Sequence, residues 1–171
     1  MTGSSPSSAG QERDRANRYA AAVYGSIVSA ALIAPFREEH ASSETAALVL
    51  ISTMAVFWAA HVWSGIMGER LHHGGALEVE HIRARGREQL PLLEATLGPV
   101  IALLLGWIGA ISDETAATLA LAVCLAELFA WGVAVGWRAY AHWWAPLLAG
   151  AVNLTLGGIL ISLEVAVFQL H

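Results

Sequence analysis

Five long apolar runs constrain what this chain can fold into more than any other feature of its sequence. A helix that crosses a hydrocarbon layer needs about 20 mostly apolar residues, and backbone in that layer has to satisfy its own hydrogen bonds. The runs span residues 19–36, 44–67, 91–111, 114–137 and 145–169. The sequence therefore predicts an all-α fold, a polytopic membrane bundle of five transmembrane helices, with the lipid bilayer as its surroundings.

The composition supports a membrane location and excludes several classes of protein. Of the 171 residues, 56% are hydrophobic and 13% are charged, whereas a soluble domain carries about 25% charged residues. All the basic residues other than His are Arg, which favours a GC-rich bacterial genome. They form no stripe interleaved with aromatic residues, so we expect no nucleic-acid partner. The single cysteine, Cys124, excludes an intrachain disulfide.

Charge outside the runs predicts the domain organisation and the orientation. Residues 1–18 are rich in Ser, Gly and charge and are expected to be a disordered tail, followed by a transmembrane domain over 19–171. Cytoplasmic loops carry the excess of Arg, and a cytoplasmic N-terminus leaves Arg37 as the one outer Arg. We therefore expect a multi-pass protein of the cell membrane with its N-terminus inside.

The one sizeable polar connection is the cytoplasmic segment 68–90. Within it, LEVEHIRARGREQL is expected to form a charged helix at the membrane surface. That helix is either a solvated linker that fixes topology, or a contact for anionic lipid or an unidentified protein partner.

A short repeat suggests a duplicated two-helix hairpin. SETAAL at 43–48 and DETAAT at 113–118 begin the second and fourth runs, and Tyr24-Gly25 and Leu97-Gly98 begin comparable stretches of the first and third. Ser43 and Asp113 are residue types that cap helix N-termini, so we expect them to cap the runs that follow.

Polar side chains inside four of the five runs predict an intramembrane polar layer. At 1.5 Å of rise per residue, Tyr24, His61, Glu127 and Asn153 all fall in the cytoplasmic half of their runs. A charge near the bilayer centre costs at least about 2.5–3.5 kcal/mol. We therefore expect Glu127 to be paired or protonated, with His61 as its partner. The Asn153 amide and the Tyr24 phenol would complete the hydrogen bonds.

This layer has three interpretations, which the sequence leaves open. It is a structural contact that fixes helix packing, a route for protons or ions, or a ligand site. Glu164 is a further intramembrane acid, close to the outer end of its run. It is either a snorkelling side chain or an outer polar site.

Metal and haem sites have weaker support. Glu69 with His72, and Glu78 with His81, repeat the Glu-x-x-His spacing that di-iron bundles use. If 68–90 folds back on itself, Glu69, His72 and His81 converge on a divalent cation; a solvated loop is the competing interpretation. A bis-His haem needs two inward-facing histidines, and only His61 lies well inside a run. We expect no bound cofactor.

The sequence contains no Gly-x-Ser-x-Gly elbow, no Gly-rich phosphate loop and no His-Glu-x-x-His motif. We therefore expect no enzyme. The leading hypothesis is a small integral membrane protein, a proton or ion channel or transporter that works through the polar layer. Because five short spans enclose little volume, a conduction path favours a homo-oligomer or a proton route. The alternatives are a membrane scaffold or accessory subunit that docks a partner through 68–90, and a metal- or haem-binding membrane protein.

Overall fold

The computed structural model describes residues 8–73, 79–139 and 142–168, and within them the side chains of 16–68, 70, 79–138, 142–163 and 165–166. The described residues form helices joined by short turns, with no strand. The helices are α1 (Ser8–Glu38), α2 (Ser43–His73), α3 (Val79–Glu88), α4 (Leu90–Trp107), α5 (Asp113–Ala139) and α6 (Ala145–Phe168). All but the short α3 contain a stretch long and apolar enough to cross a membrane, giving five spans. The predicted fold class is therefore confirmed.

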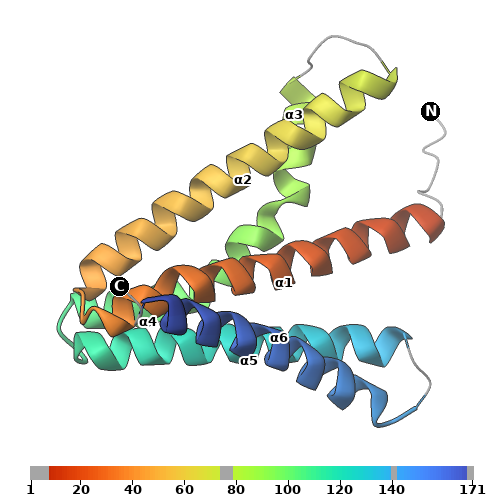
Figure 1. Cartoon of the computed structure of the whole chain (residues 1–171). Helices are drawn as coiled ribbons and strands as arrows, with labels where there is room; N and C mark the ends of the chain where they lie inside the picture. Colours follow the sequence, from red (N-terminus) through yellow and green to blue (C-terminus); the bar gives the residue numbers. More distant parts are fainter. Residues whose placement is uncertain (1–7, 74–78, 140–141, 169–171) are drawn as a thin grey trace.

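Four of the spans pack together and the fifth diverges from them. α1, α4, α5 and α6 form a bundle, and α2 leaves it at an angle, with α3 and the start of α4 running between α2 and the bundle (Figure 1). The tight connections from α1 to α2 and from α4 to α5 lie at one end, here called the α1–α2 end. The opposite end, called the α5–α6 end, holds the connection from α5 to α6 and the start of α1.

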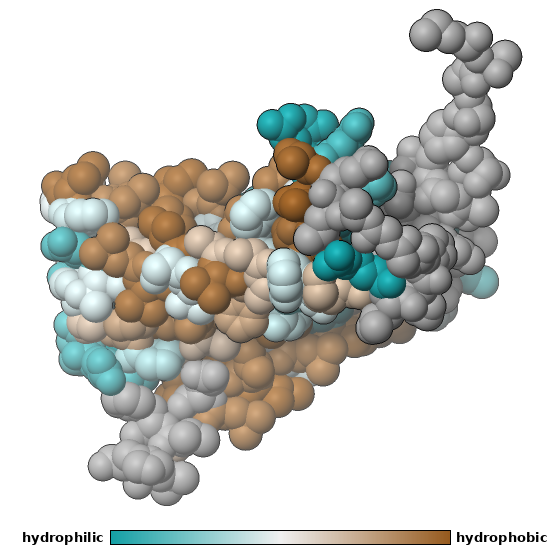
Figure 2. Space-filling view, turned by 90° about the horizontal axis from the view of Figure 1, so that it is seen from above, coloured by the Kyte–Doolittle hydropathy of each residue, from teal (hydrophilic) through white to brown (hydrophobic). Residues whose placement is uncertain are grey.

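Small residues dominate the core, as expected where helices associate in lipid. Helix packing in a membrane relies on close van der Waals contact, which small side chains permit. The buried set from α1, α2, α4 and α5 includes Ala30, Ala34, Ala46, Ala47, Ala102, Ala117, Ala120 and Cys124. Large apolar side chains instead cover the outside, for example Val56 (68% exposed) and Leu97 (60% exposed). Figure 2 shows this apolar surface, with hydrophilic residues toward its two ends.

Glycines bring α5 and α6 closest together. A β-carbon added to Gly132 would lie 2.6 Å from both Ala149 O and Gly150 Cα, and one added to Gly136 would lie 2.5 Å from Pro146 Cα. These are backbone atoms, so only glycine fits at either position. The Gly132-x-x-x-Gly136 spacing is the small-xxx-small pattern of close transmembrane contacts.

The buried positions recur in the manner that a duplicated hairpin would produce. Ser43 N–H donates to Asp113 Oδ1 (2.9 Å), so residues seventy positions apart meet at the starts of α2 and α5. At that same offset, the buried residues of α2 match buried residues of α5: Ala46, Ala47, Leu50 and Met54 against Ala116, Ala117, Ala120 and Cys124. Burial in α1 and α4 matches in the same way when Gly25 is aligned with Gly98: Ala22, Ser29 and Ala30 against Ala95, Ala102 and Leu103.

The helix caps lie one residue earlier than predicted. Ser42 Oγ accepts a hydrogen bond from Thr45 N–H (3.3 Å), and Ser112 Oγ accepts one from Thr115 N–H (3.2 Å). These are N-cap hydrogen bonds to the third helical residue. Ser43 and Asp113 are instead the first residues of their helices, and they bond to each other across the bundle.

The ends of two runs also differ from their predicted positions. Residues 8–18, expected to be disordered, continue α1 as helix. Ala, Gln, Glu and Arg favour helix, and extending an existing helix needs no new nucleus. The third run, expected to reach residue 111, ends its helix at Trp107, because the chain turns through Gly109, whose φ is 74°.

The charged helix α3 packs against α2. Trp58 Nε1–H donates to Gly86 O (3.1 Å), and a β-carbon on Gly65 would contact Arg85 Cδ at 3.6 Å. Arg85 also forms an ion pair with Glu88 (2.7 Å). Residues 79–88 of the predicted cytoplasmic segment therefore help to hold α2 at its angle.

Candidate functional site

The Glu127 carboxyl lies between three spans, near the middle of α5. Ser26 of α1 donates its hydroxyl to Glu127 Oε2 at 3.0 Å. On the other side, a β-carbon added to Gly98 of α4 would lie 2.7 Å from Glu127 Oε1. The missing side chain at Gly98 is what gives the carboxyl room against α4, so α1, α4 and α5 together build its site.

No cation among the described side chains pairs with this carboxyl. Within the described side chains, neither an Arg nor a His forms an ion pair with Glu127, whose one hydrogen-bond donor is the Ser26 hydroxyl. A carboxylate removed from water without a cation is costly. Binding a proton removes that cost, and a protonated carboxyl can still hydrogen bond to a hydroxyl. The arrangement therefore suits a group that takes up and releases a proton.

A small cavity lies on one side of Glu127, toward the α5–α6 end. It has a volume of about 190 Å³, and its lining residues come from α1, α4 and α5: Arg18, Tyr19, Pro91, Glu94 and Trp131. Trp131 is one helical turn from Glu127, and Glu94 is one turn from Gly98, a distance of about 6 Å in each case. Arg18 and Glu94 are exposed at its mouth. We call this cavity the vestibule.

Two aromatic rings partly wall the vestibule. Tyr19 of α1 and Trp131 of α5 meet edge to face, with ring centroids 5.5 Å apart and planes at 70°. Edge-to-face pairs of this kind are favourable contacts. The pair therefore positions an aromatic wall one turn from the carboxyl.

On the side of Glu127 away from the vestibule, one more polar side chain, Ser29, precedes an apolar core. Ser29, one turn along α1 from Ser26, is fully buried, and its hydroxyl has no hydrogen-bond partner in the structure. Such a group is a place where an ordered water commonly binds. Beyond it toward the α1–α2 end, Ile33, Leu103 and Ala120 are completely buried. Polar groups thus extend from the vestibule past Glu127 to Ser29, and packed apolar side chains follow.

His61, the expected partner of Glu127, lies elsewhere. Its Nδ1 is 2.9 Å from Phe57 O of its own helix, and its ring is 5.5 Å from the Tyr24 ring, centroid to centroid. In the described structure no contact joins His61 to Glu127, so this prediction is wrong. The reason is that α1 lies between α2 and α5 (Figure 1). Tyr24 and Ser26 are two residues apart, so their side chains point about 160° apart around α1; one meets His61 and the other meets Glu127.

Asn153, the fourth predicted member of the layer, hydrogen bonds to α5. Its Nδ2–H donates to Leu128 O at 3.3 Å, and its side chain lines a separate, larger pocket. The predicted layer therefore consists of three separate groups at similar depth: Tyr24 with His61, Ser26 with Glu127, and Asn153.

The remaining predicted sites stay predictions. The side chains of Glu69, His72 and Glu164 lie outside those that the structure describes. His81 is exposed on α3. Among the described side chains, no three His, Cys, Asp or Glu residues gather closely enough to hold a metal ion.

Sequence reasoning left the vestibule residues out of the site. Arg18 and Tyr19 begin the first run, Pro91 and Glu94 begin the third, and Trp131 lies near the end of the fourth. The first and third spans start, and the fourth span ends, at the same membrane face, so these residues lie at a similar depth. That shared depth was the sequence signal that could have identified them as one site.

No family model, curated protein or solved structure matches this chain.

Proposed function

We propose that this integral membrane protein moves protons, alone or coupled to a solute, with Glu127 as the proton-binding group. The observation that carries the proposal is a half-buried carboxyl that has a hydroxyl, and no cation, as its described partner, one turn from a cavity with an exposed mouth. An intramembrane acid that faces the inside of a bundle is by default a hypothesis for a functional site.

The proposed route begins at the α5–α6 end. Water enters the vestibule between the exposed Arg18 and Glu94 and passes the Tyr19–Trp131 wall. A proton then binds Glu127, whose carboxyl is held by the Ser26 hydroxyl. The Arg distribution favours the cytoplasm as the side that the α5–α6 end faces, so we propose that protons enter from there.

The apolar segment beyond Ser29 makes the route one-sided in this conformation. Ile33, Leu103 and Ala120 separate Ser29 from the α1–α2 end. Transfer to the other face then requires a second conformation, in which water reaches Glu127 from that end. A group that is accessible from one side at a time is what a transporter needs and what an open channel does not have.

The scaffold hypothesis is the main alternative, and a flux measurement separates the two. The protein is reconstituted into liposomes with a pH-sensitive dye inside, and a potassium gradient with valinomycin drives proton movement. We expect wild-type protein to acidify the lumen faster than empty liposomes, and Glu127→Gln to reduce the rate to that of empty liposomes.

Two further variants make the result specific. Glu114→Gln changes an exposed acid of the same helix outside the site and should leave the rate unchanged. His61→Gln should also leave it unchanged, because His61 lies across α1 from the route. Thermal unfolding of each variant in detergent shows whether it is folded. Wild-type flux in a folded Glu127→Gln protein would refute the proposal and favour the scaffold.

A further inference from the structure

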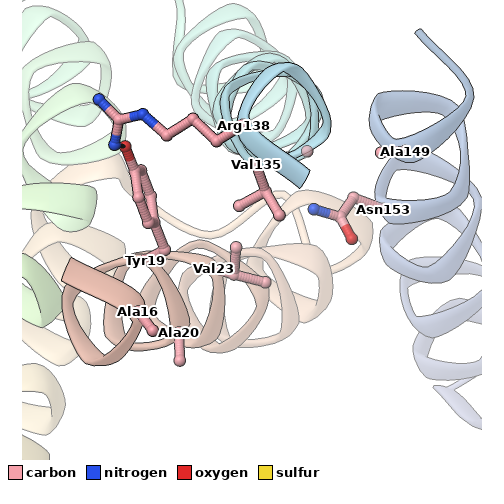
Figure 3. Close-up of a pocket in the computed structure, with 9 residues that line it drawn as sticks. Ala16, Tyr19, Ala20, Val23, Val135, Arg138, Ala149 and Asn153 are labelled. Atoms are coloured by element: carbon pink, nitrogen blue, oxygen red, sulfur yellow. Dashed lines mark hydrogen bonds between the residues drawn. The ribbon is translucent and has the colours of Figure 1, made fainter. Parts of the chain in front are cut away.

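A second and larger pocket opens between α1, α5 and α6 (Figure 3), and Tyr19 lines both this pocket and the vestibule. Its volume is about 720 Å³, within the range of about 300–1,000 Å³ that small-molecule sites occupy. Most of its lining is small and apolar: Ala16, Ala20, Val23, Gly132, Val135 and Ala149. Three polar side chains complete it: Tyr19, Arg138 and Asn153.

The polar groups of this pocket lie at different levels. Arg138 is in the last turn of α5, and Figure 3 shows its guanidinium beside the Tyr19 ring. Arg138 donates a hydrogen bond to the Tyr19 hydroxyl, and its Cζ lies 5.4 Å from the centre of that ring. Asn153 lies deeper, at the α6 wall. The pocket thus has a cationic entrance and an apolar interior.

The charge of Arg138 is not neutralised by the described residues. No described carboxylate pairs with it; its partner is the Tyr19 phenol. A guanidinium is a strong and specific donor to phosphate oxygens. The entrance is therefore suited to bind an anion.

Aromatic residues place the entrance at the headgroup level of a membrane. Trp137, Trp143 and Trp144 surround the α5–α6 connection and are 74%, 83% and 48% exposed. Exposed Trp residues concentrate at the membrane–water interface. Arg138, next to Trp137, is then at the depth of lipid phosphates, and the apolar part of the pocket is at the depth of the acyl chains.

We propose that this pocket is a binding site for an anionic phospholipid of the leaflet at the α5–α6 end. The phosphate of the headgroup accepts hydrogen bonds from Arg138, and one acyl chain lies along Ala20, Val23 and Val135. A net negative headgroup is required because a zwitterionic lipid carries its own cation to pair with the phosphate. This site is independent of whether Glu127 moves protons.

Native mass spectrometry of the detergent-solubilised full chain tests the proposal directly. Phosphatidylglycerol and phosphatidylcholine with identical acyl chains are titrated separately. We expect wild-type protein to bind one phosphatidylglycerol about fivefold more tightly than phosphatidylcholine, since a basic residue near the membrane surface contributes about 1 kcal/mol toward an anionic lipid. Equal affinities would overturn the proposal.

Variants identify the residues that hold the lipid. Arg138→Gln should abolish the preference for phosphatidylglycerol, and Arg138→Lys should keep it. Arg37→Gln, in the last turn of α1 at the α1–α2 end, should have no effect. Ala20→Trp fills the apolar part and should weaken both lipids while Arg138 stays in place. If Arg138→Gln and Arg37→Gln changed the preference equally, the lipid would be bound elsewhere and the proposal would fail.

Discussion

The close backbone contact between α5 and α6 at Gly132 offers a sharp test of the structure. In Gly132→Ala, the added β-carbon would lie 2.6 Å from Ala149 O and 2.6 Å from Gly150 Cα. Ordinary contacts between such atoms are about 3.5–4.0 Å, so α5 and α6 have to separate by about 1 Å. Because both neighbours are backbone atoms, no side-chain rotation can relieve the contact.

The magnitude follows from two opposing terms. Overpacking of this kind costs about 1–3 kcal/mol, and replacing Gly by Ala inside a helix gains about 1 kcal/mol from helix propensity. Gly158→Ala in α6 is the matched control, because a β-carbon there meets nothing within 4 Å. The propensity term is common to both variants, so we expect Gly132→Ala to be less stable than Gly158→Ala by about 1–3 kcal/mol.

The assay is equilibrium unfolding in mixed micelles. The fraction of sodium dodecyl sulfate is raised, and far-ultraviolet circular dichroism and tryptophan fluorescence follow the loss of structure. Free energies of unfolding are compared at one detergent composition. If Gly132→Ala were as stable as Gly158→Ala, α5 and α6 would not approach each other as described. The larger pocket, which Gly132 and Ala149 line, would then have a different shape.

Three further predictions use other contacts. Ser42→Ala and Ser112→Ala each remove an N-cap and should lower the free energy of unfolding by about 1 kcal/mol, measured in the same micelles; an unchanged value would contradict the capping assignment. Trp58→Phe removes the indole N–H that α2 donates to Gly86 O of α3. It should lower the free energy of unfolding by about 1 kcal/mol, with faster amide hydrogen exchange in residues 79–88 by mass spectrometry. Equal exchange in the two proteins would show that α3 is held by other contacts. Gly98→Ala places a β-carbon 2.7 Å from the site carboxylate and should slow proton flux in liposomes, whereas Gly68→Ala, with nothing within 4 Å of its β-carbon, should leave flux unchanged.

The spans were predictable because length and hydropathy are properties of the chain itself. Each run of about 20 apolar residues has one outcome in a bilayer, a helix. The repeat of SETAAL and DETAAT was also readable, and its buried positions recur in the structure. The residues that cap α2 and α5 could not be identified from the sequence. In each case two adjacent residues can cap, Ser42 and Ser43 or Ser112 and Asp113. Contact between the two hairpins decides which of them does so.

The partners of the polar residues were not predictable from depth alone. Sequence gives the level of His61 and Glu127 along their helices, but the direction each faces depends on how neighbouring helices pack. Glu127 and His61 are at similar depth, yet α1 stands between them. Ser26 is a small hydroxyl in an Ala-rich helix and gave little sign that it would be the partner of the acid.

The divergence of α2 has a consequence for the membrane itself. Because α2 departs from the bundle toward the α5–α6 end (Figure 1), the protein takes up more area in one leaflet than in the other. A wedge of this shape is least strained where the leaflet around its broad end is stretched.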